Sequence, residues 1–524
     1  MFRAPVGRLF RGAALLGLAT ALVGGMSRGL PAQATSAPVP PQGYQTNTQF
    51  AASNRGIANV QASSPTQGGA TDVNGACQGV VTYNQDHSES DLALDPQNPQ
   101  HLLGASKFFY QDSQYIFHLG SYTSFDGGAS FANGIIPDYD CVTSGDARQW
   151  QNTTDPTVTF DGQGGAYTLV LAFNWSSTNT TDAVVGVSKS TDGGQSWGRP
   201  AILTTEQSAA LGDSLDKQWI SARGPHVFAA WAVFGGNGSV TIYDSYSSDS
   251  GATWSRPTVL ASPSIDQAQN TYVYPRFAPD GTLYVAFTNT PKKQQQQYGT
   301  EKIYVLKSTD SGVTFTNQGQ AVAFASPPYT YQNTTFRDGI DDYFQVSPYD
   351  GALLLAYQAW NLEGTGTTDI FALISHDGGL TWSTPILVND DPNTAVSDQL
   401  QPAIAAAPNG RIAVAFYDRR LACPTNDANI LPAHYGAANF CINTAVQFYD
   451  ATLQPLGHNV RASATTWDPE QQRVTADGGT GFIGDYFALA LSGSQTFVLN
   501  VSTANLGHNP AHYQQQFLQT VPNP

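Results

Sequence analysis

Short apolar segments alternate with glycine-bearing turns along most of the chain. Three stretches, beginning at Asp155, Tyr274 and Asp341, repeat one order of features: a strand, a turn, a second strand, a variable loop, a third strand, a turn and a fourth strand. Within the strands, β-branched and aromatic residues recur at the alternate positions typical of β structure. The pattern predicts an all-β chain built from four-stranded antiparallel units.

A short phrase, Ser-x-Asp-x-Gly-x-x-Trp/Phe, follows the third strand in five units. It occurs as SFDGGASF, STDGGQSW, SSDSGATW, STDSGVTF and SHDGGLTW, with 66, 57, 61 and 67 residues between successive aspartates. In such a turn the aspartate can accept backbone N–H bonds, glycine supplies a positive φ, and the aromatic ring packs between sheets. The five aspartates of this phrase are Asp126, Asp192, Asp249, Asp310 and Asp377.

This phrase resembles the Asp-box, or bacterial neuraminidase repeat, of β-propellers in the sialidase-like superfamily. The resemblance covers nearly all of the chain after about residue 76. It implies a propeller whose Asp-boxes are structural and lie away from the active site, so we assign a structural role to their five aspartates. It also implies action on extracellular glycans, as an exo-glycosidase of the exo-α-sialidase type.

The repeat spacing predicts how many blades the propeller has. Residues 76–524 hold about seven units at this spacing, including two degenerate units that follow the last Asp-box. We predict seven blades, with six, the sialidase number, as the alternative. The last unit lacks a fourth strand, and CQGVVTYNQ, which begins at Cys77, is expected to supply it. Such closure would leave no exposed sheet edge.

The topology of a four-stranded meander predicts where a site would lie. The turns between strands 1 and 2 and between strands 3 and 4 share one face, here called the turn face. The loops between strands 2 and 3, and the starts of the inner strands, lie on the opposite loop face. The residues predicted to ring the axis there are Asp91, Asp155, Asp216, Arg276, Asp342, Asp398 or Gln401, and Asp485. The ends of the second strands add Tyr110, Trp175, Trp231, Gln358, Trp360, Tyr417, Asp418 and Arg419.

Three interpretations of this ring remain open. Carboxylates beside aromatic rings suit sugars, because rings stack on C–H groups while carboxylates bond hydroxyls. Converging carboxylates also suit Ca²⁺, although no cofactor is required. Alternatively, each aspartate bonds its own turn and has only a structural role. The candidate substrate-binding residues are Asp91, Asp216, Asp342, Asp485, Trp175, Trp231, Trp360 and Tyr417.

The sialidase resemblance also implies catalytic roles. Sialidases hold the sialate carboxylate with three arginines, and they use a tyrosine nucleophile, a glutamate that activates it and an aspartic acid/base. The positions of this chain that could take these roles are Arg276, Arg337 and Arg419; Tyr486 or Tyr343; Glu363; and Asp155. The Arg-Ile-Pro phrase that carries the first arginine in sialidases is absent, and an acidic rim disfavours an anionic substrate. The alternative function is a non-catalytic propeller that binds glycan or protein.

Charge and composition restrict the partners. The chain has 23 Lys+Arg against 40 Asp+Glu, a formal net charge of −17. An acidic surface excludes polyanions, so nucleic acid is not an expected partner. No segment after the N-terminal region is apolar for long enough to span a membrane. We expect a monomer that acts on glycans or glycoproteins.

The N-terminal region indicates export. Three arginines precede an apolar run over residues 13–25, and Ala32-Gln33-Ala34 offers a cleavage site, which predicts a signal peptide over residues 1–34. Residues 35–75, rich in Gln, Ser, Thr and Pro, are typical of a disordered tether. The four cysteines would then occupy an oxidising compartment. Of three possible pairings we favour Cys423 with Cys441 and Cys77 with Cys141. The protein is thus predicted to be secreted, extracellular or at the cell surface.

Overall fold

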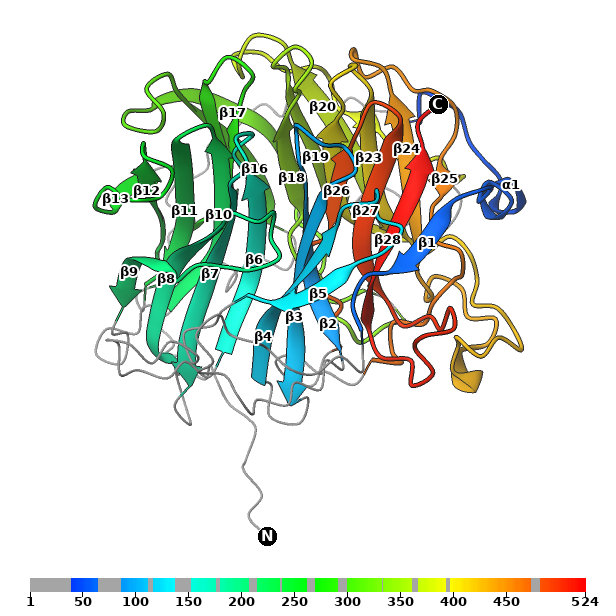
Figure 1. The fold of residues 1–524 in the computed structure, drawn as a ribbon. Coiled ribbons are helices and arrows are strands. Elements are labelled where there is room, and N and C mark those ends of the chain that lie inside the picture. Colours follow the sequence, from blue (N-terminus) through cyan, green and yellow to red (C-terminus); the bar gives the residue numbers. More distant parts are fainter. Residues whose placement is uncertain are drawn as a thin grey trace, which may run out of the picture.

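The structure, a computed structural model, is a seven-bladed β-propeller (Figure 1). It describes residues 39–64, 86–111, 116–136, 152–175, 180–206, 214–235, 238–261, 269–290, 299–331, 333–360, 366–392, 396–472 and 481–524. The described strands form seven four-stranded antiparallel sheets arranged around one axis. The prediction of an all-β propeller with seven blades is confirmed, and the six-bladed alternative is wrong.

The blades follow one another along the chain, each from its inner to its outer strand. Blade 1 contains β2 (His87–Leu94), β3 (Leu102–Gln111), β4 (Ile116–Ser124) and β5 (Ala132–Ile135). Blade 2 contains β6 (Asn152–Phe160), β7 (Ala166–Trp175), β8 (Thr180–Ser190) and β9 (Ala201–Glu206). Blade 3 contains β10 (Ser214–Arg223), β11 (His226–Phe234), β12 (Val240–Ser247) and β13 (Thr258–Ala261). Blade 4 contains β14 (Gln269–Phe277), β15 (Leu283–Thr290), β16 (Thr300–Ser308) and β17 (Thr316–Ala325).

The remaining blades have shorter inner or outer strands. Blade 5 contains β18 (Asp342–Val346), β19 (Leu353–Trp360), β20 (Thr368–Ser375) and β21 (Ile386–Leu387). Blade 6 contains β22 (Gln399–Ala406), β23 (Ile412–Asp418), β24 (Asn443–Tyr449) and β25 (Val460–Arg461). Blade 7 contains β26 (Ala488–Leu491), β27 (Gln495–Ser502), β28 (Gln515–Pro522) and, from the other end of the chain, β1 (Ala58–Gln61).

The Asp-boxes form the predicted turns between third and fourth strands. In blade 1, Asp126 Oδ1 accepts the Ser130 N–H at 2.9 Å, and the Ser124 hydroxyl donates to the same oxygen at 2.8 Å. The other four boxes repeat this pattern. The box aromatics pack between blades: Trp197 of blade 2 is 3% exposed in a cluster with Leu103 of blade 1. These contacts fix the angle between neighbouring sheets and hold the turn face rigid.

The ring is closed by a strand from the N-terminal region. Strand β1 pairs with β28, with Ala58 opposite Thr520 and Gln61 opposite Phe517, so β1 completes the last blade as its outer strand. CQGVVTYNQ lies outside the described residues, and the position we predicted for it belongs to Ala58–Gln61. An outer strand needs few apolar residues, and β1 is largely exposed or half-buried. Its polar sequence therefore gave no strand signal.

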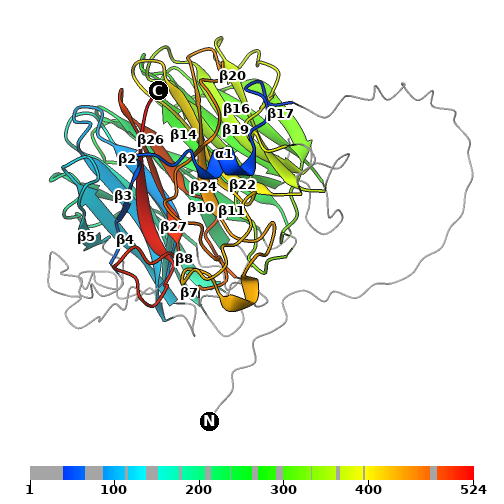
Figure 2. The same cartoon turned by 90° about the vertical axis from the view of Figure 1, so that its right-hand side faces the viewer.

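Residues 39–64 are ordered, although their composition is typical of a tether. The short helix α1 (Asn47–Ala51) lies against the outer edge of blade 6 (Figure 2). Asn47 Nδ2 donates to the Arg420 carbonyl at 2.9 Å, and Asn54 Nδ2 donates to the Arg461 carbonyl at 2.9 Å. Phe50 is fully buried, with the Arg420 guanidinium 4.3 Å from its ring centroid. Amide side chains thus anchor this segment through backbone carbonyls, with one aromatic residue as its apolar contact.

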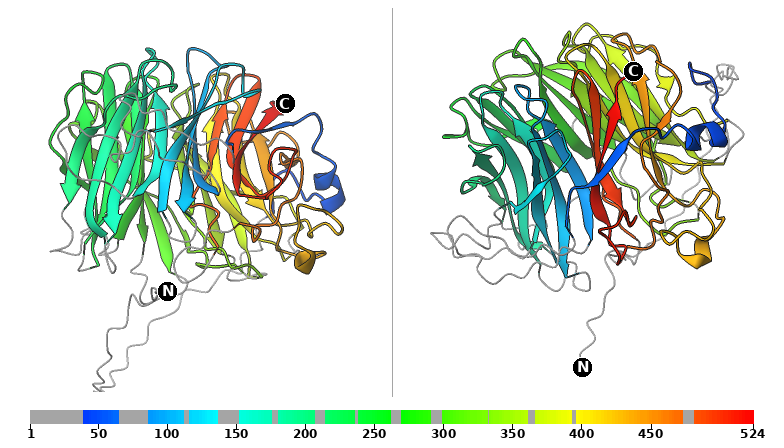
Figure 3. Two further views of the ribbon diagram at one scale, coloured as in Figure 1. Left: turned by 60° about the horizontal axis from the view of Figure 1, so that its bottom comes forward. Right: turned by 45° about the vertical axis from the view of Figure 1, so that its right-hand side comes forward.

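The longest described loop of the loop face follows β23. A disulfide joins Cys423 and Cys441 across it, as predicted, and a 3-10 helix, η4 (Pro432–His434), lies within it (Figure 3). The predicted pair Cys77 and Cys141 and the predicted signal peptide lie outside the described residues. Among the residues described, no helix is long and apolar enough to cross a membrane.

Candidate functional site

Five inner strands contain a non-glycine residue in the left-handed backbone conformation. Glu89, Asp155, Lys217, Tyr272 and Gln401 have φ between 51° and 57°. Each lies where its inner strand shifts register against the second strand of its blade. In blade 7 the corresponding position is Gly484, with φ 99°. Such residues are uncommon, cost about 1–3 kcal/mol each and cluster at functional sites.

The register shift brings charged side chains of different blades together near the axis. Lys217 Nζ lies 2.6 Å from Asp485 Oδ2, 3.3 Å from Asp155 Oδ2 and 3.7 Å from Asp216 Oδ1. Arg337 Nη1 lies 2.5 Å from the other oxygen of Asp485. We call Glu89, Lys107, Asp155, Asp216, Lys217, Arg337 and Asp485 the axial charge cluster.

Blade 1 adds a buried pair to this cluster. Lys107 Nζ lies 2.7 Å from Glu89 Oε2 and donates to Thr154 Oγ1 at 3.2 Å, and the Thr154 hydroxyl donates to Asp155 Oδ1 at 2.6 Å. The side chains of Lys107 and Glu89 are 4% and 1% exposed. Lys107 also lies 4.7 Å from the centroid of the Phe117 ring. The cluster is therefore continuous from blade 1 through blades 2 and 3 to blade 7.

The environment separates the pKa values of the carboxyl groups. Burial would raise the pKa of Asp155, but Lys217 and Lys107 outweigh it and hold that pKa far below its usual range. The pKa of Asp485 is lowered in the same way as that of Asp155, because Arg337 and Lys217 outweigh the effect of burial. Burial raises the pKa of Glu89 well above its usual value, and Asp155 raises it further. Carboxyl groups with lowered and with raised pKa values thus lie side by side.

Asp216 is the most accessible carboxyl group of the cluster. Its side chain is 36% exposed, against 5% for Asp155 and 2% for Asp485. Burial within the ring, only partly opposed by Lys217, raises the pKa of Asp216 to about 6, and Asp155 adds to the rise. Arg337 and Lys217 follow in exposure, at 21% and 13%. A ligand arriving from the loop face would contact these three groups first.

Aromatic side chains of blades 3, 4, 5 and 7 meet near the axis, and those of blades 3, 4 and 7 lie two residues after a left-handed position. Trp219 lies with its ring centroid 4.7 Å from Tyr274, 5.9 Å from Tyr343 and 5.3 Å from Tyr486. All four are at most 6% exposed. Inner strands run from the loop face to the turn face, so this aromatic layer lies on the turn side of the axial charge cluster.

Beyond the aromatic layer, a cavity of about 1100 Å³ opens to the turn face. It is lined by the ends of inner strands and by turns of all seven blades. Arg276 lies in its inner part, two residues after Tyr274, with the guanidinium 5.5 Å from the centroid of the Trp219 ring. Asp91 also lines it and accepts the Val158 N–H at 2.7 Å.

The structure brings together some of the candidate catalytic residues and separates others. Asp155 and Arg337 belong to the axial charge cluster, and Tyr486 adjoins it, donating to the Pro156 carbonyl at 3.2 Å. Arg276 lies on the turn side of the aromatic layer, near the end of β14 and not at its start as predicted. Arg419 is fully buried and pairs with Asp398 at 2.9 Å. The three arginines therefore share no site, and Glu363 lies outside the described residues.

The candidate substrate-binding residues are divided in the same way. Asp216 and Asp485 belong to the axial charge cluster, whereas Asp91 lies on the turn side. Asp342, Trp231 and Tyr417 are 1% exposed and pack between sheets. Burial raises the pKa of Asp342 to about 8. Trp360 is half-buried at the end of β19, and the side chain of Trp175 lies outside the described residues.

Sequence reasoning missed three members of the cluster, namely Glu89, Lys107 and Lys217. A signal for two of them exists, because the runs HSES and DKQ interrupt the alternation of inner strands. Consecutive polar residues inside a buried strand indicate a bulge, which turns the following side chains. Lys217 also takes the position among carboxylates where an axial cation was considered. In the described part of the chain, no group of three or more His, Cys, Asp or Glu is placed to hold a metal ion.

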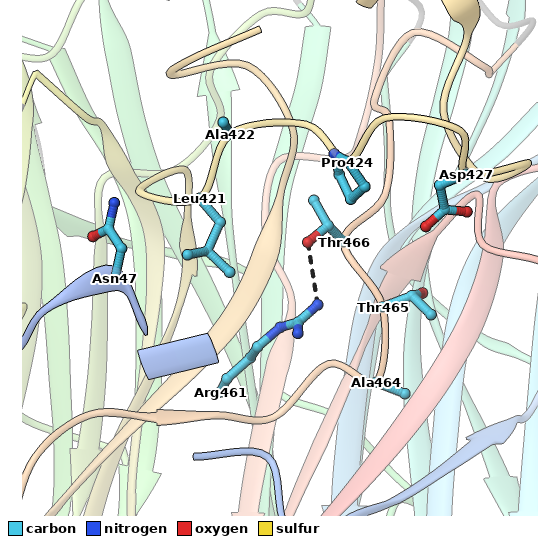
Figure 4. Close-up of a pocket in the computed structure, with 9 residues that line it drawn as sticks. All are labelled: Asn47, Leu421, Ala422, Pro424, Asp427, Arg461, Ala464, Thr465 and Thr466. Carbon is cyan, nitrogen blue, oxygen red and sulfur yellow. Dashed lines mark hydrogen bonds between the residues drawn. The ribbon is translucent and has the colours of Figure 1, made fainter. Parts of the chain in front are cut away.

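A smaller pocket of about 460 Å³ lies beside the disulfide-closed loop (Figure 4). Arg461 lies on one side of it, donating to Thr466 Oγ1 at 3.1 Å and to Asn443 Oδ1 at 2.8 Å. Burial lowers the pKa of Arg461. Asp427 lies on another wall, where its carboxylate accepts the Asn429 N–H at 2.9 Å. The pocket is polar but is separate from the axis.

Comparison with known protein families supports the interpretation of the repeat. A family model described as a BNR repeat-like domain matches residues 226–428, which confirms the resemblance of these repeats. No curated protein sequence matches the chain. We therefore conclude that the chain carries BNR-type repeats on a seven-bladed propeller.

Solved structures with a similar fold have low identity to the chain. An α-L-arabinanase from Penicillium chrysogenum, complexed with arabinobiose, is 11% identical, with 68% of this chain and 92% of that chain covered and a TM-score of 0.43. A sialidase from Trypanosoma rangeli, in complex with sialic acid, is 13% identical, with coverage of 89% and 59% and a TM-score of 0.41. A protein of unknown function from Dyadobacter fermentans is 11% identical, with coverage of 90% and 100% and a TM-score of 0.44. At such values, the function has to be argued from this chain's own residues.

Proposed function

We propose that the protein is an exported glycan-acting enzyme of the glycosidase type, with its active site at the axial charge cluster. The observation that carries the proposal is Asp216: a partly exposed carboxyl group with a pKa of about 6, whose neighbours Asp155 and Asp485 are held ionised by Lys217. Carboxyl groups whose environments drive their pKa values apart are characteristic of acid/base sites. Glycoside hydrolysis needs such a protonated acid beside an ionised carboxylate.

Five members of the cluster have a role in this proposal. Asp216 donates a proton to the leaving oxygen as the glycosidic bond breaks. Water then adds to the sugar carbon and gives its proton to the Asp216 carboxylate, which restores the acid. The negative charge of Asp155 and Asp485 stabilises the positive charge that develops on the sugar ring. Lys217 and Arg337 donate hydrogen bonds to sugar hydroxyls and keep the two buried carboxylates ionised.

The preferred substrate of this proposal is a neutral sugar. A sialate carboxylate needs several convergent arginines, but Arg276, Arg337 and Arg419 have separate partners. Arg337 is the one arginine of the cluster, and it is already paired with Asp485. A cluster with a single, paired arginine favours neutral glycosides over sialosides.

The test is hydrolysis of a panel of aryl glycosides by residues 35–524. The panel contains neutral hexosides, an α-L-arabinofuranoside and a sialoside, the last two suggested by the names of the similar structures. Asp216→Asn should lower kcat/KM for the best substrate by about 10²–10⁴-fold, the range of general acid catalysis. Asp280→Asn, the same change on the turn face, is the matched control and should leave kcat/KM unchanged. Equal activity of wild type and Asp216→Asn would contradict the assignment of the acid.

The alternative is a non-catalytic propeller that binds glycan or protein at the same cluster. It is favoured by the state of Tyr486, whose hydroxyl is engaged by the Pro156 carbonyl and whose pKa is raised well above its usual value by burial and by Asp155. Binding of a glycan that depends on Asp216 and Lys217, without hydrolysis of any glycoside in the panel, would support this alternative.

A further inference from the structure

The turn-side cavity lies on the opposite side of the aromatic layer from the axial charge cluster. All of its lining residues belong to the described part of the chain, and its volume of about 1100 Å³ is at the upper end for small-ligand sites. Trp219 and Tyr343, both 4% exposed, close its inner end. A ligand in this cavity cannot contact Lys217 or Asp216 across that layer.

Arg276 is a cation that retains unused donors beside its hydrogen bonds to Pro275 and Tyr343. Of its five donors, Nη1 donates to the Pro275 carbonyl at 2.9 Å, while Nε is buried and has no hydrogen-bond partner. The guanidinium lies 5.5, 5.8 and 5.6 Å from the ring centroids of Trp219, Tyr274 and Tyr343. Unlike Arg337, Arg419 and Arg420, it forms none of the ion pairs found among the described residues. Such a guanidinium is suited to a planar carboxylate.

The cavity walls above Arg276 suit a ligand that carries hydroxyl groups. Hydroxyl and amide side chains are among the residues that line the cavity. The turns at the rim add carboxylates, including Asp161 and Asp280, which already accept backbone N–H groups of their own turns. These carboxylates disfavour a ligand with several negative charges, because like charges repel at short range. The cavity thus combines Arg276 at its inner end, and Arg223 and His226 in its lining, with walls that hydrogen-bond neutral polar groups. The wall residues of this kind are Thr159, Gln163, Ser221, Gln345 and Ser492.

We propose that the turn-side cavity is a second ligand site, which binds a sugar acid with a single carboxylate, a hexuronate, by pairing that carboxylate with Arg276. The sugar hydroxyls contact the walls, and the aromatic layer forms the floor. This site does not depend on the activity proposed for the loop face.

Asp91 gives the site a pH signature. Burial raises the pKa of Asp91 to about 6, against the lowering effects of the Val158 N–H and of Arg276. Below this pH Asp91 is neutral, so the full charge of Arg276 acts on the ligand, and the hexuronate, an acid with a pKa near 3.5, remains ionised. Affinity should therefore rise as the pH falls from 7.5 to 5. Four side chains face Arg276 from the neighbouring inner strands and do not titrate in this range: Trp219, Ser221, Tyr343 and Gln345. The other charged or titratable groups that line the cavity belong to its turns and strand ends: Asp95, Asp161, Arg223, His226 and Asp280.

The experiment is calorimetric titration of residues 35–524 with D-glucuronate at pH 5 and pH 7.5. D-glucose has the sugar ring without the carboxylate, and acetate has the carboxylate without the sugar ring. Each should bind at least tenfold more weakly than D-glucuronate. Arg276→Gln should weaken glucuronate binding at least tenfold, whereas Arg411→Gln, another turn-face arginine outside the cavity, should change it less than twofold. Asp91→Asn should bind with the same affinity at both pH values.

Several results would overturn the proposal. These are no binding of glucuronate to folded wild-type protein, equal affinity for acetate, or unchanged affinity in folded Arg276→Gln. If that variant does not fold, the pH dependence in wild type still decides, and an affinity that does not rise toward pH 5 would refute the pairing of the carboxylate with Arg276 beside Asp91. Loss of glycoside hydrolysis in Asp216→Asn with glucuronate binding intact would separate this site from the proposed active site.

Discussion

Removing the amino group of Lys217 should destabilise the propeller in a pH-dependent manner. Lys217→Met keeps the aliphatic stem but leaves Asp155 and Asp485, 5% and 2% exposed, without the ammonium that lies 3.3 and 2.6 Å away. Breaking a buried ion pair by deleting one partner costs about 3–5 kcal/mol. For a folded part of several hundred residues, the entropy of unfolding is about 1 kcal/mol/K at Tm, so Tm should fall by about 3–5 °C.

The sign of the pH effect follows from the two carboxyl groups. In wild type their folded-state pKa values are depressed, so they contribute stability above the unfolded-state pKa near 3.9 and lose it as the pH falls through the folded-state pKa. Without Lys217, burial raises both pKa values, and the carboxyl groups take up protons at mildly acid pH. The Tm difference should therefore be largest at pH 7.5 and smaller at pH 5.

Calorimetric melting of wild type and Lys217→Met at both pH values tests this reasoning. Lys307→Met is the matched control, because Lys307 is a half-buried lysine of β16 whose Nζ lies 5.8 Å from the centroid of the Tyr284 ring. It should shift Tm by no more than about 1 °C. A Lys217→Met variant with the same Tm as wild type at pH 7.5 would refute this account of the axial charge cluster. A Tm difference that grows toward pH 5 would refute it as well.

Three further predictions concern the Asp-box, the stapled loop and Tyr486. Asp192→Ala removes the acceptor of the Ser196 N–H and should cost about 1 kcal/mol, as a lost cap does, without changing kcat/KM; a loss of activity would contradict the structural role. Replacing Cys423 and Cys441 together by serine opens a loop with a sequence separation of 18 and should cost about 3 kcal/mol, measured by calorimetry; an unchanged Tm would contradict it. Tyr486→Phe should keep most of the hydrolytic activity, because the hydroxyl is buried and bonded to Pro156; a loss of about 100-fold or more would favour a sialidase-type nucleophile.

The sequence predicted the architecture because the repeat is local. Ser-x-Asp-x-Gly-x-x-Trp/Phe specifies a turn through contacts within a few residues, as in Ser124, Asp126 and Ser130, so each copy marks one blade without long-range information. The pairing of Cys423 with Cys441 could be predicted for the same reason, since the two residues bracket a single loop.

The site was only partly predictable, because its geometry depends on backbone shifts that alternation does not reveal. The prediction placed Arg276 with the loop-face residues, but Arg276 lies seven residues into β14, beyond the bulge between Thr271 and Tyr274. Lys217 occupies the left-handed position itself, so its side chain turns toward carboxylates of other blades. Ring closure by β1 was hidden because an outer strand can be polar.

The most direct test of the central claim is the pH dependence of kcat/KM for the best substrate of the glycoside panel, in wild type and in Asp216→Asn. The account requires Asp216 to be protonated, so wild-type kcat/KM should decline as the pH rises through about 6. Asp216→Asn should be weakly active and should lack this decline. A wild-type profile that stays flat across pH 6, or the same decline in Asp216→Asn, would show that the axial charge cluster does not supply the catalytic acid.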